Sequence, residues 1–273
     1  ATINRSADTQ TDKYDGVFTP YVAFNHTYGN LSHPYYRLER MQEWSDALDW
    51  TKGSLGILPD GEWQAICFDN ENSYYSKGKK QTGSVGMRLS HKLTGLKRGN
   101  IQFDADLGAV LQYKHLDYQR NEQSYNIERH AYSFRPTLTM EYRSKGIHKW
   151  SPELRLNYTG KQQLPNLLNM LQIEDYADPL NLFRGNASLQ GIYVHQLAFR
   201  YGMNQRESGH STYISIQYTR THNDIVASST YNTENGGRIY EMVNTNRTHA
   251  ANGEVGYSLP LDKKKNFFIT LSL

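Results

Sequence analysis

Two acidic residues in one short segment are the first groups in the sequence that could do chemistry. Asp104 and Asp106 lie two residues apart in an alternating run, so both carboxylates face the same side of a strand. Glycoside hydrolysis uses two carboxylates that flank a cleft, one of them as an acid. The sequence offers this pair neither a cleft nor an acid partner. We therefore assign both residues to the wet face of a strand, without a catalytic role.

Other candidate chemistry is weakly supported. Residues 69–72 (DNEN) offer carboxylate oxygens for Ca²⁺ but lack the glycine and the 12-residue spacing of an EF-hand. Residues 78–84 (GKKQTGS) are basic and contain glycine, yet they do not match a phosphate-binding loop. Histidines such as His91, His115 and His130 occur singly, and none forms the helical pair of a zinc hydrolase. We predict a protein without enzymatic activity, cofactor or metal site.

The composition indicates a chain with one apolar face and one wet face. Of the 273 residues, 37% are hydrophobic and 12% aromatic, with 21 Tyr against 9 Phe, and the mean hydropathy is −0.75. A soluble domain of this size carries more aliphatic residues, and a disordered chain lacks aromatics. The net charge of +3 is too small to indicate nucleic-acid binding. The single cysteine, Cys67, excludes an internal disulfide.

Targeting signals are absent from the sequence. No stretch approaches 18 consecutive apolar residues, so no transmembrane helix is predicted. The first ten residues, ATINRSADTQ, lack the basic flank and the apolar run of a signal peptide. Either the protein stays inside the cell or this chain is a processed or excised piece.

Strict alternation of apolar and polar residues is the dominant pattern of the chain. In residues 101–114 (IQFDADLGAVLQYK) the odd positions hold only Ile, Phe, Ala, Leu and Tyr, while most even positions are polar. Such a run predicts an extended strand with one apolar and one polar face. The same period predicts nine strands over 17–28, 84–93, 101–115, 128–142, 153–159, 192–203, 211–227, 238–259 and 266–273.

The connections between these strands alternate in length. Short links are predicted at 94–100, 143–151, 203–210 and 259–265, and long ones at 29–83, 116–127, 160–191 and 228–237. An antiparallel meander places every second connection at the same end. One end then carries short turns and the other long loops, which is typical of an outer-membrane β-barrel. A soluble antiparallel sheet or sandwich also alternates, and the loop asymmetry is the feature that favours the barrel.

The predicted strands are long enough for a membrane. Fourteen residues tilted near 45° cover roughly 30 Å, more than the ~25 Å apolar band of such barrels, and tyrosine suits the water–lipid boundary. We expect Ile101, Phe103, Leu107, Leu111, Ile214 and Ile216 to face outward. We expect Gln102, Asp104, Gln112, Ser215 and Gln217 on the concave side.

The last predicted strand stops in the middle of its alternating run, at Leu273. Bacterial barrels have an even number of strands and no unpaired edge. We therefore expect an unclosed antiparallel meander of nine or ten strands that is part of a larger barrel. A piece with an open edge is not expected to form a pore by itself.

The motifs of the second half of the chain occur in an order that is similar to that of a known family. They are FRPTLTMEY (134–142), LRLNYTGKQQLPNLLNML (154–171), YADPLNLFRGNASLQ (176–190), YISIQYTRTHNDIV (213–226) and IYEMVNTNRTHAANGEVGYSL (239–259). Residues 134–273 resemble the barrel of a TonB-dependent outer-membrane receptor of the Bacteroidetes type. Residues 1–133 fit only as generic barrel strands with long loops. The chain departs from the family pattern at Ala187, Gln190 and Gly191, where the family usually has prolines and a glutamate.

The resemblance implies one partial, all-β barrel domain over residues 1–273, in the bacterial outer membrane and in contact with its lipid. It implies two protein partners, TonB through a plug domain that this chain does not contain, and a surface lipoprotein. The implied function is uptake of a scarce nutrient such as an iron chelate, a glycan or a peptide. A small passive or adhesive outer-membrane barrel and a soluble antiparallel β-sheet binding domain are the alternatives.

The connection over 160–191 contains residues that shape a loop. Pro179 has a fixed φ and biases Asp178 towards an extended conformation, whereas Gly185 and Asn186 tolerate a positive φ. We expect these residues to fold the loop over the barrel rim, with Phe183 and Arg184 as candidate ligand contacts at an entrance. A loop without any ligand contact is the simpler interpretation, because backbone geometry alone explains the glycine and the proline.

The connection over 29–83 is predicted as a long external insertion with a helix. Apolar residues in 36–50 recur at helical spacing, which predicts an amphipathic helix that packs against the rest of its own loop. Trp44, Trp50 and Trp63 could stack on a sugar ring, and three tryptophans in a long loop can equally form its core.

Overall fold

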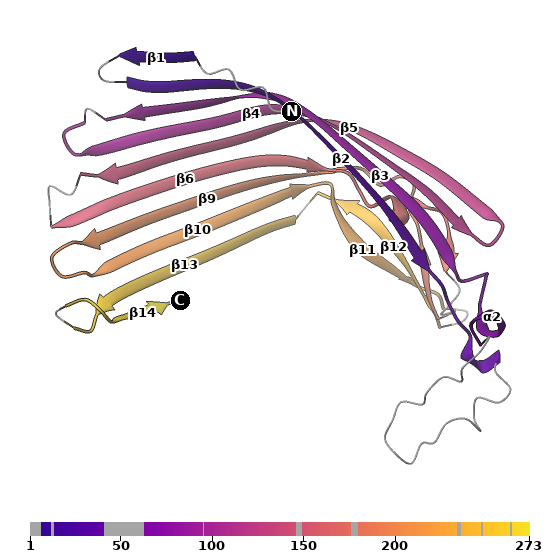
Figure 1. Cartoon of the computed structure of the whole chain (residues 1–273). Coiled ribbons are helices and arrows are strands. Elements are labelled where there is room, and N and C mark those ends of the chain that lie inside the picture. Colours follow the sequence, from indigo (N-terminus) through magenta and orange to yellow (C-terminus); the bar gives the residue numbers. More distant parts are fainter. Residues whose placement is uncertain are drawn as a thin grey trace.

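A computed structural model describes residues 7–11, 14–40, 63–94, 96–145, 149–175, 180–233, 236–246, 248–262 and 264–273. Ten strands form one curved antiparallel sheet, whose two outermost strands in this order do not pair with each other (Figure 1). In spatial order they are β1 (Ala7–Thr11), β2 (Tyr14–His33), β3 (Tyr74–Leu93), β4 (Gly99–Arg120), β5 (Gln123–Ser144), β6 (Trp150–Gln163), β9 (Ile192–Gln205), β10 (Ser211–His222), β13 (Thr248–Pro260) and β14 (Phe268–Ser272).

A second, smaller sheet and three short helical turns complete the described structure. The sheet has the order β11 (Asp224–Tyr231), β12 (Arg238–Thr245), β8 (Asn181–Arg184) and β7 (Glu174–Asp175). The helical turns are η1 (Leu38–Arg40), α2 (Trp63–Cys67) and η3 (Leu167–Met170). Of the helices in the described ranges, none has the length and apolar character needed to cross a membrane.

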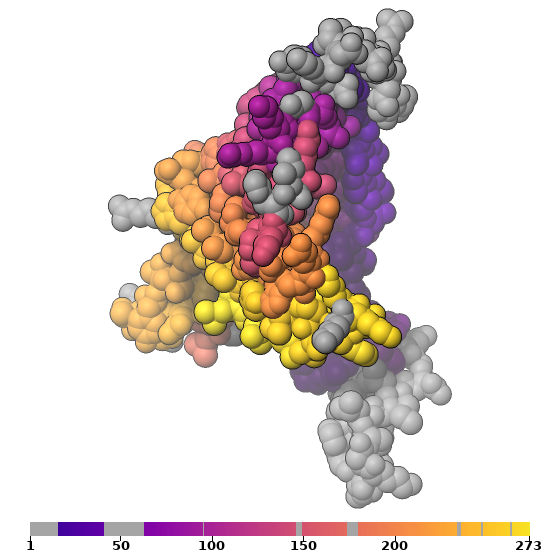
Figure 2. All heavy atoms as spheres, turned by 90° about the vertical axis from the view of Figure 1, so that its left-hand side faces the viewer, coloured from indigo at the N-terminus to yellow at the C-terminus, as the bar shows by residue number. Residues whose placement is uncertain are grey.

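The predicted meander, with short turns at one end and long connections at the other, is confirmed. The strands of the large sheet follow one another in sequence order, apart from the segments that enter the small sheet. Figure 1 shows the turns after β3, β5, β9 and β13 at the left-hand end and the connections after β2, β4, β6 and β10 at the other. Figure 2 views the end with the short turns, where magenta residues lie at the top, orange ones below them and yellow ones at the bottom.

Two of the predicted long connections are wrong in their extent. β2 continues to His33 and β3 begins at Tyr74, so the connection predicted over 29–83 shrinks to residues 34–73. The loop predicted over 116–127 is a two-residue turn, because β4 and β5 pair as far as Arg120 and Gln123. Asn121 takes a φ of 52°, as tight hairpin turns require. Paired strands project beyond the apolar region, where residue polarity no longer distinguishes strand from loop.

Two predicted strands are interrupted. The run over 211–227 ends as β10 at His222, since Asn223 takes a φ of 53° and turns the chain out of the large sheet. The run over 238–259 likewise divides into β12 and β13. The separated parts pair with each other as the β11–β12 hairpin of the small sheet.

Side chains alternate between an apolar and a polar face of the large sheet. Phe103 and Ile216 are 42% and 49% exposed on the apolar face. On the other face Asp104 accepts hydrogen bonds from Ser90 and Gln102. Also on this face, Arg135 of β5 reaches Tyr21 of β2 across a separation of roughly 14 Å of flat sheet. Side chains of strands this far apart can meet on the face towards which the sheet curves. The polar face is therefore the concave one, in agreement with the residues predicted to face outward and inward.

The apolar band does not end at the same level on every strand. On β13 the outward residues become polar at His249, which is in register with Arg220 on β10 and, through it, with His195 on β9. On β2 and β3 the outward residues become polar at His26 and Gln81, and this level continues in register to His130 on β5. Measured along β5, the two levels are about 20 Å apart.

A lysine on the apolar face tests this orientation. Because Ile216 lies near the middle of the band, Ile216→Lys is expected to lower the free energy of unfolding in lipid by about 2–4 kcal/mol. Gln217→Lys, on the opposite face of the same strand, is the control and should change it by less than about 1 kcal/mol. Urea unfolding of the chain in phospholipid vesicles measures both values. Equal losses in the two variants would contradict the assignment of the faces.

Candidate functional site

The connection between β6 and β9 folds back onto the end of the β4–β5 hairpin. Apolar side chains of the connection and of the hairpin form the main buried cluster of the described chain: Leu116, Tyr118, Leu167, Met170, Leu171 and Leu189. Met170 is only 1% exposed. Burial of this kind gives residues 164–191 a defined conformation at the loop end of the sheet.

Polar side chains from the concave face fix the same connection. Lys114 Nζ donates to the carbonyl oxygens of Leu164 and Pro165 at 2.9 and 3.0 Å. Arg129 Nη2 donates to the carbonyl oxygen of Ala187 at 2.9 Å. Charged donors make stronger hydrogen bonds than neutral ones, so β4 and β5 hold both halves of the connection.

Gly185 and Asn186 lie inside this connection. Neither residue has the positive φ that its type would tolerate. A Cβ atom on Gly185 would lie 1.6 Å from the carbonyl oxygen of Leu171, so close packing of two backbone segments requires the glycine. Asn186 Oδ1 accepts from the backbone N–H of Ser188, and its Nδ2 donates to the carbonyl oxygen of Met242 at 2.9 Å. These contacts join the connection to the β11–β12 hairpin.

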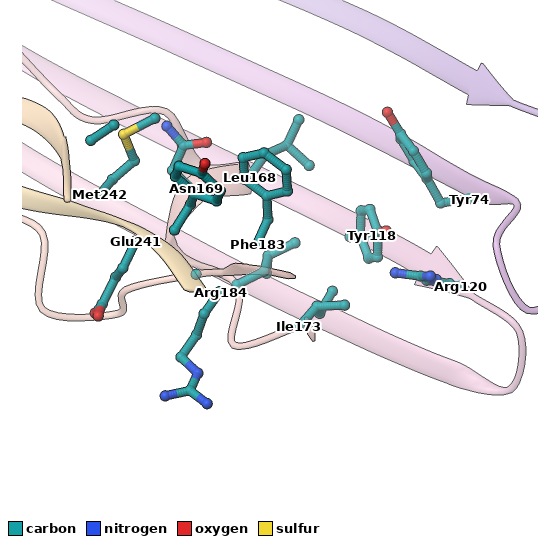
Figure 3. Close-up of a pocket in the computed structure, with 14 residues that line it drawn as sticks. Tyr74, Tyr118, Arg120, Leu168, Asn169, Ile173, Phe183, Arg184, Glu241 and Met242 are labelled. Carbon is teal, nitrogen blue, oxygen red and sulfur yellow. The ribbon is translucent and has the colours of Figure 1, made fainter. Parts of the chain in front are cut away.

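A pocket of about 250 Å³ lies between the folded connection, the β11–β12 hairpin and the ends of β3 and β4. Two pairs of aromatic rings contribute to its wall. Tyr74 stacks on Tyr118 with centroids 5.3 Å apart, and Phe183 stacks on Tyr240 at 5.2 Å. Figure 3 shows Phe183 beside Leu168, with Tyr74 and Tyr118 further along the pocket.

Charged side chains surround these rings. Arg120, Arg184 and Glu241 line the pocket, and Arg184 and Glu241 are paired in the register of β8 and β12. Figure 3 shows these two side chains extending in a similar direction, away from Tyr74 and Tyr118. Arg120 Nε donates to the carbonyl oxygen of Glu71 at 2.6 Å, which links the pocket to the connection between β2 and β3. Aromatic walls with a charged rim suit the binding of a ring-containing ligand.

The described lining of the pocket contains one acidic residue, Glu241. Within the described ranges, no cluster of three or more His, Cys, Asp or Glu side chains is placed to hold a metal ion.

The connection between β2 and β3 is organised around one buried carboxylate. Asp69 is 1% exposed and accepts hydrogen bonds from Arg37 Nε at 2.6 Å and from Asn72 Nδ2 at 2.7 Å. Burial by itself raises the pKa of Asp69. The hydrogen bonds from Asn72 and Arg37 and the charge of Arg37 outweigh burial, so the pKa lies below its ordinary value. The ionised side chain therefore stabilises this connection.

The predicted site residues that the structure describes lie in two different connections. Phe183 and Arg184 line the pocket, as their candidacy for ligand contact requires. Trp63 lies in α2 and packs on Tyr36, with centroids 5.2 Å apart, inside the connection between β2 and β3. Trp44, Trp50, Asp178 and Pro179, and the expected helix beyond Arg40, lie outside the described residues.

Sequence reasoning missed the other aromatic residues of the pocket. Tyr118 lies in the segment interpreted as a loop, because Leu116 and Tyr118 are apolar at even positions, whereas the apolar residues of 101–114 occupy odd positions. The period of two persists there on the opposite face, and this was a usable signal. Tyr74 and Tyr240 reach the pocket only because the connections fold together, and their sequence neighbours give no indication of it.

Comparisons with known proteins are consistent with this geometry. A model of a family described as "Outer membrane protein beta-barrel family" matches residues 94–273. A search of curated proteins found no match.

Solved structures that the chain resembles are described as receptors by their titles. The Serratia marcescens hemophore receptor HasR, in complex with HasA and heme, is 12% identical over 90% of this chain and 40% of its own, with a TM-score of 0.40. The ferric enterobactin receptor PfeA of Pseudomonas aeruginosa is 11% identical over 94% of this chain and 40% of its own, with a TM-score of 0.40. The siderophore receptor PirA of the same organism is 10% identical, with 99% and 55% covered and a TM-score of 0.37. The chain thus spans about half or less of their length.

Substitution of Gly185 tests the packing of the folded connection. Gly185→Ala is expected to push the backbone around residue 185 away from Leu171 and to loosen the connection over 164–191, because the added Cβ has no space. Limited proteolysis of the chain in detergent should then cut this connection at least about tenfold faster, which corresponds to a loss of about 1.4 kcal/mol of local stability. Gly83→Ala is the control, since nothing lies within 4 Å of a Cβ there. Equal cleavage rates in both variants would refute the packing argument.

The carboxylate of Asp69 predicts an acid-sensitive connection. Since its pKa is lowered in the folded state, its contribution is complete above the ordinary pKa of about 4 and is lost as the pH falls through the lower value. We expect hydrogen exchange of the Ser73 amide, which donates to the carbonyl oxygen of Asp69, to show increased opening below about pH 4. Asp69→Asn should remove this pH dependence, and Glu71→Gln should keep it. An unchanged profile in Asp69→Asn would contradict the assignment.

Proposed function

Because the chain belongs to the outer membrane protein beta-barrel family, we propose that it forms the barrel segment of a receptor for uptake of a scarce nutrient across the bacterial outer membrane. The ligand is first held in the pocket lined by Phe183, Tyr240 and their neighbours. Energy for release comes through TonB, which acts on a plug domain in the longer protein. A surface lipoprotein is a further partner of the receptor.

One observation carries this proposal. The connections at one end of the sheet are folded into a module with its own buried core and an aromatic pocket. A barrel that only provides a passive channel does not need ordered connections with stacked rings at its mouth. Capture of a dilute ligand does need them, because a preformed site loses less entropy on binding. A catalytic function is not part of the proposal.

The chemistry of the pocket narrows the candidate nutrients. Flat aromatic side chains stack on sugar rings and on other planar groups, and each favourable ring contact contributes about 0.5–1.5 kcal/mol beyond buried area. A glycan or an aromatic iron chelate fits this description better than an extended aliphatic peptide. The charged residues Arg120, Arg184 and Glu241 would orient polar groups of such a ligand.

Growth experiments with the full-length gene test the proposal. A deletion strain is supplied with heme as sole iron source, with a plant glycan mixture as sole carbon source, or with a tryptic peptide mixture as sole nitrogen source. Loss of growth on one source is expected. Phe183→Ala with Tyr240→Ala should reduce uptake from that source by about tenfold, from two lost stacking contacts.

Tyr132→Ala is the matched control, because Tyr132 is 77% exposed on the outward face and distant in register from the pocket. It should leave uptake unchanged. If the deletion strain grows normally on every source, the passive or adhesive barrel becomes the better interpretation. If the deletion strain fails to grow on one source and the variant with Phe183→Ala and Tyr240→Ala grows normally on it, the ligand is captured elsewhere on the receptor.

A further inference from the structure

Charge is segregated along the concave face of the large sheet. Among the side chains that the structure describes on these strands, the inward carboxylates lie at or below the level of Asp106, towards the short turns: Asp104, Asp106, Glu141, Glu153 and Glu254. Inward cations accompany them in this half. Between Asp106 and the loop end, the inward charges of the described strands are all positive: Lys80, Lys114, Arg120, Arg129, Arg135 and Lys161. A solute that enters from the loop end therefore meets a cationic wall first.

The ring of Tyr21 lies across Gly86 and Gly108 and forms the floor of this cationic region. Tyr21, Gly86, Gly108 and Arg135 are partners in register on four successive strands. A Cβ on Gly86 or Gly108 would lie within 2.8 Å of Tyr21 Oη, so the ring can lie flat only over glycine. Tyr21 Oη donates to Asp106 Oδ1 at 2.7 Å and accepts from Arg135 Nη2 at 3.2 Å. These bonds hold the Arg135 guanidinium in place over the sheet.

A groove of about 580 Å³ extends over this floor towards the loop end and reaches the edge of β2, where Val22 and Phe24 of the outward face also line it. Three cations line it: Lys80, Arg88 and Arg135. Tyr21, Asn25, Thr82 and Ser84 add hydroxyl and amide groups, and no carboxylate is part of the described lining. The volume lies in the range of sites for small ligands.

Two of these cations are left without a compensating acid. Arg88 pairs with Asp106 at 3.0 Å and lies over the Tyr21 ring. No carboxylate of the described chain lies within ion-pair distance of Lys80 or Arg135. Lys80 is also directly opposite Lys114 in the register, and like charges in this arrangement destabilise a sheet. A bound anion would remove this repulsion and would accept the bidentate hydrogen bonds that a guanidinium offers.

We propose that this groove is a binding site for a small polyanion with carboxylate or phosphate groups. Lys80 and Arg135 contact the charged groups, and the hydroxyl and amide groups of β2 and β3 bind the polar remainder. The inference deepens the proposed function, on which it rests, by assigning a charge to the cargo. After release from the aromatic pocket, an anionic cargo would meet this groove along the concave wall.

Isothermal titration calorimetry of the chain in a zwitterionic detergent tests the site, with citrate and inorganic pyrophosphate as probes. At least one probe should bind at low salt, and its affinity should fall as salt is added. Trimethyl citrate, which is uncharged, should not bind. Lys80→Gln and the double variant Lys80→Gln/Arg135→Gln should weaken binding progressively, by at least tenfold in the double variant.

Control variants separate charge from folding. Lys80→Arg should keep binding within about threefold, since it keeps the charge. Lys92→Gln, which removes an inward cation from the half with mixed charges, should also leave the affinity unchanged. Absence of binding by both anions, equal binding of trimethyl citrate, or equal affinities in the double variant and in Lys92→Gln would each overturn the proposal.

The calorimetric result and the growth result are distinguishable. If the anions bind as expected and the deletion strain shows no uptake defect, the groove is supported and the transport function fails. If uptake is lost on deletion and neither anion binds, the receptor function is supported and the anionic character of the cargo is refuted.

Discussion

Every feature of this chain depends on the pairing of its backbone within hydrocarbon. An unpaired N–H or C=O group in a bilayer costs several kcal/mol, so each membrane-crossing segment must bond to neighbours along its length. β3 satisfies this requirement with unbroken partners on both sides, from Tyr74 to Leu93. Pairing of this length also fixes which side chains face lipid and which face the concave wall. The positions of the charged groups and of the folded connections follow from that division.

The sequence predicts a strand well where one face of the strand contacts lipid and the other face contacts polar groups. In residues 101–114 lipid contacts one face and polar groups the other, so the alternation revealed β4. Beyond Tyr113 the outward face is polar as well, while Leu116 and Tyr118 on the inner face are covered by the folded connection. The apolar residues therefore change from the outward to the inward face within one strand, and the alternation of 101–114 does not continue in the same phase. The β4–β5 hairpin extends to Arg120 because the hydrogen bonds between its two backbones continue that far. The residue types do not indicate these hydrogen bonds.

The candidate site shows a similar limit. Phe183 and Arg184 could be singled out because they lie in a connection with turn-forming residues. Tyr74 and Tyr118 are more than forty positions apart in the chain and stack only after β3 and β4 have paired. Gly185 was noticed for a local backbone reason, yet its role comes from contact with Leu171, fourteen residues earlier. The local sequence can single out a residue such as Gly185. The residue that it contacts is known only from the tertiary structure.

The insertion of the β11–β12 hairpin has a consequence for how such a protein can change. β10 and β13 pair up to Thr221 and Thr248, and beyond them the N–H of Asn223 donates to Asn246 Oδ1 at 2.8 Å. The hairpin therefore departs and returns at adjacent points, whose separation is set by the spacing of two neighbouring strands. A hairpin of different length or sequence can be exchanged at this position without altering the register of the barrel. Genetic recombination at Asn223 and Asn246 would exchange the hairpin between related proteins. The products would keep the same membrane-spanning strands and acquire a new ligand preference.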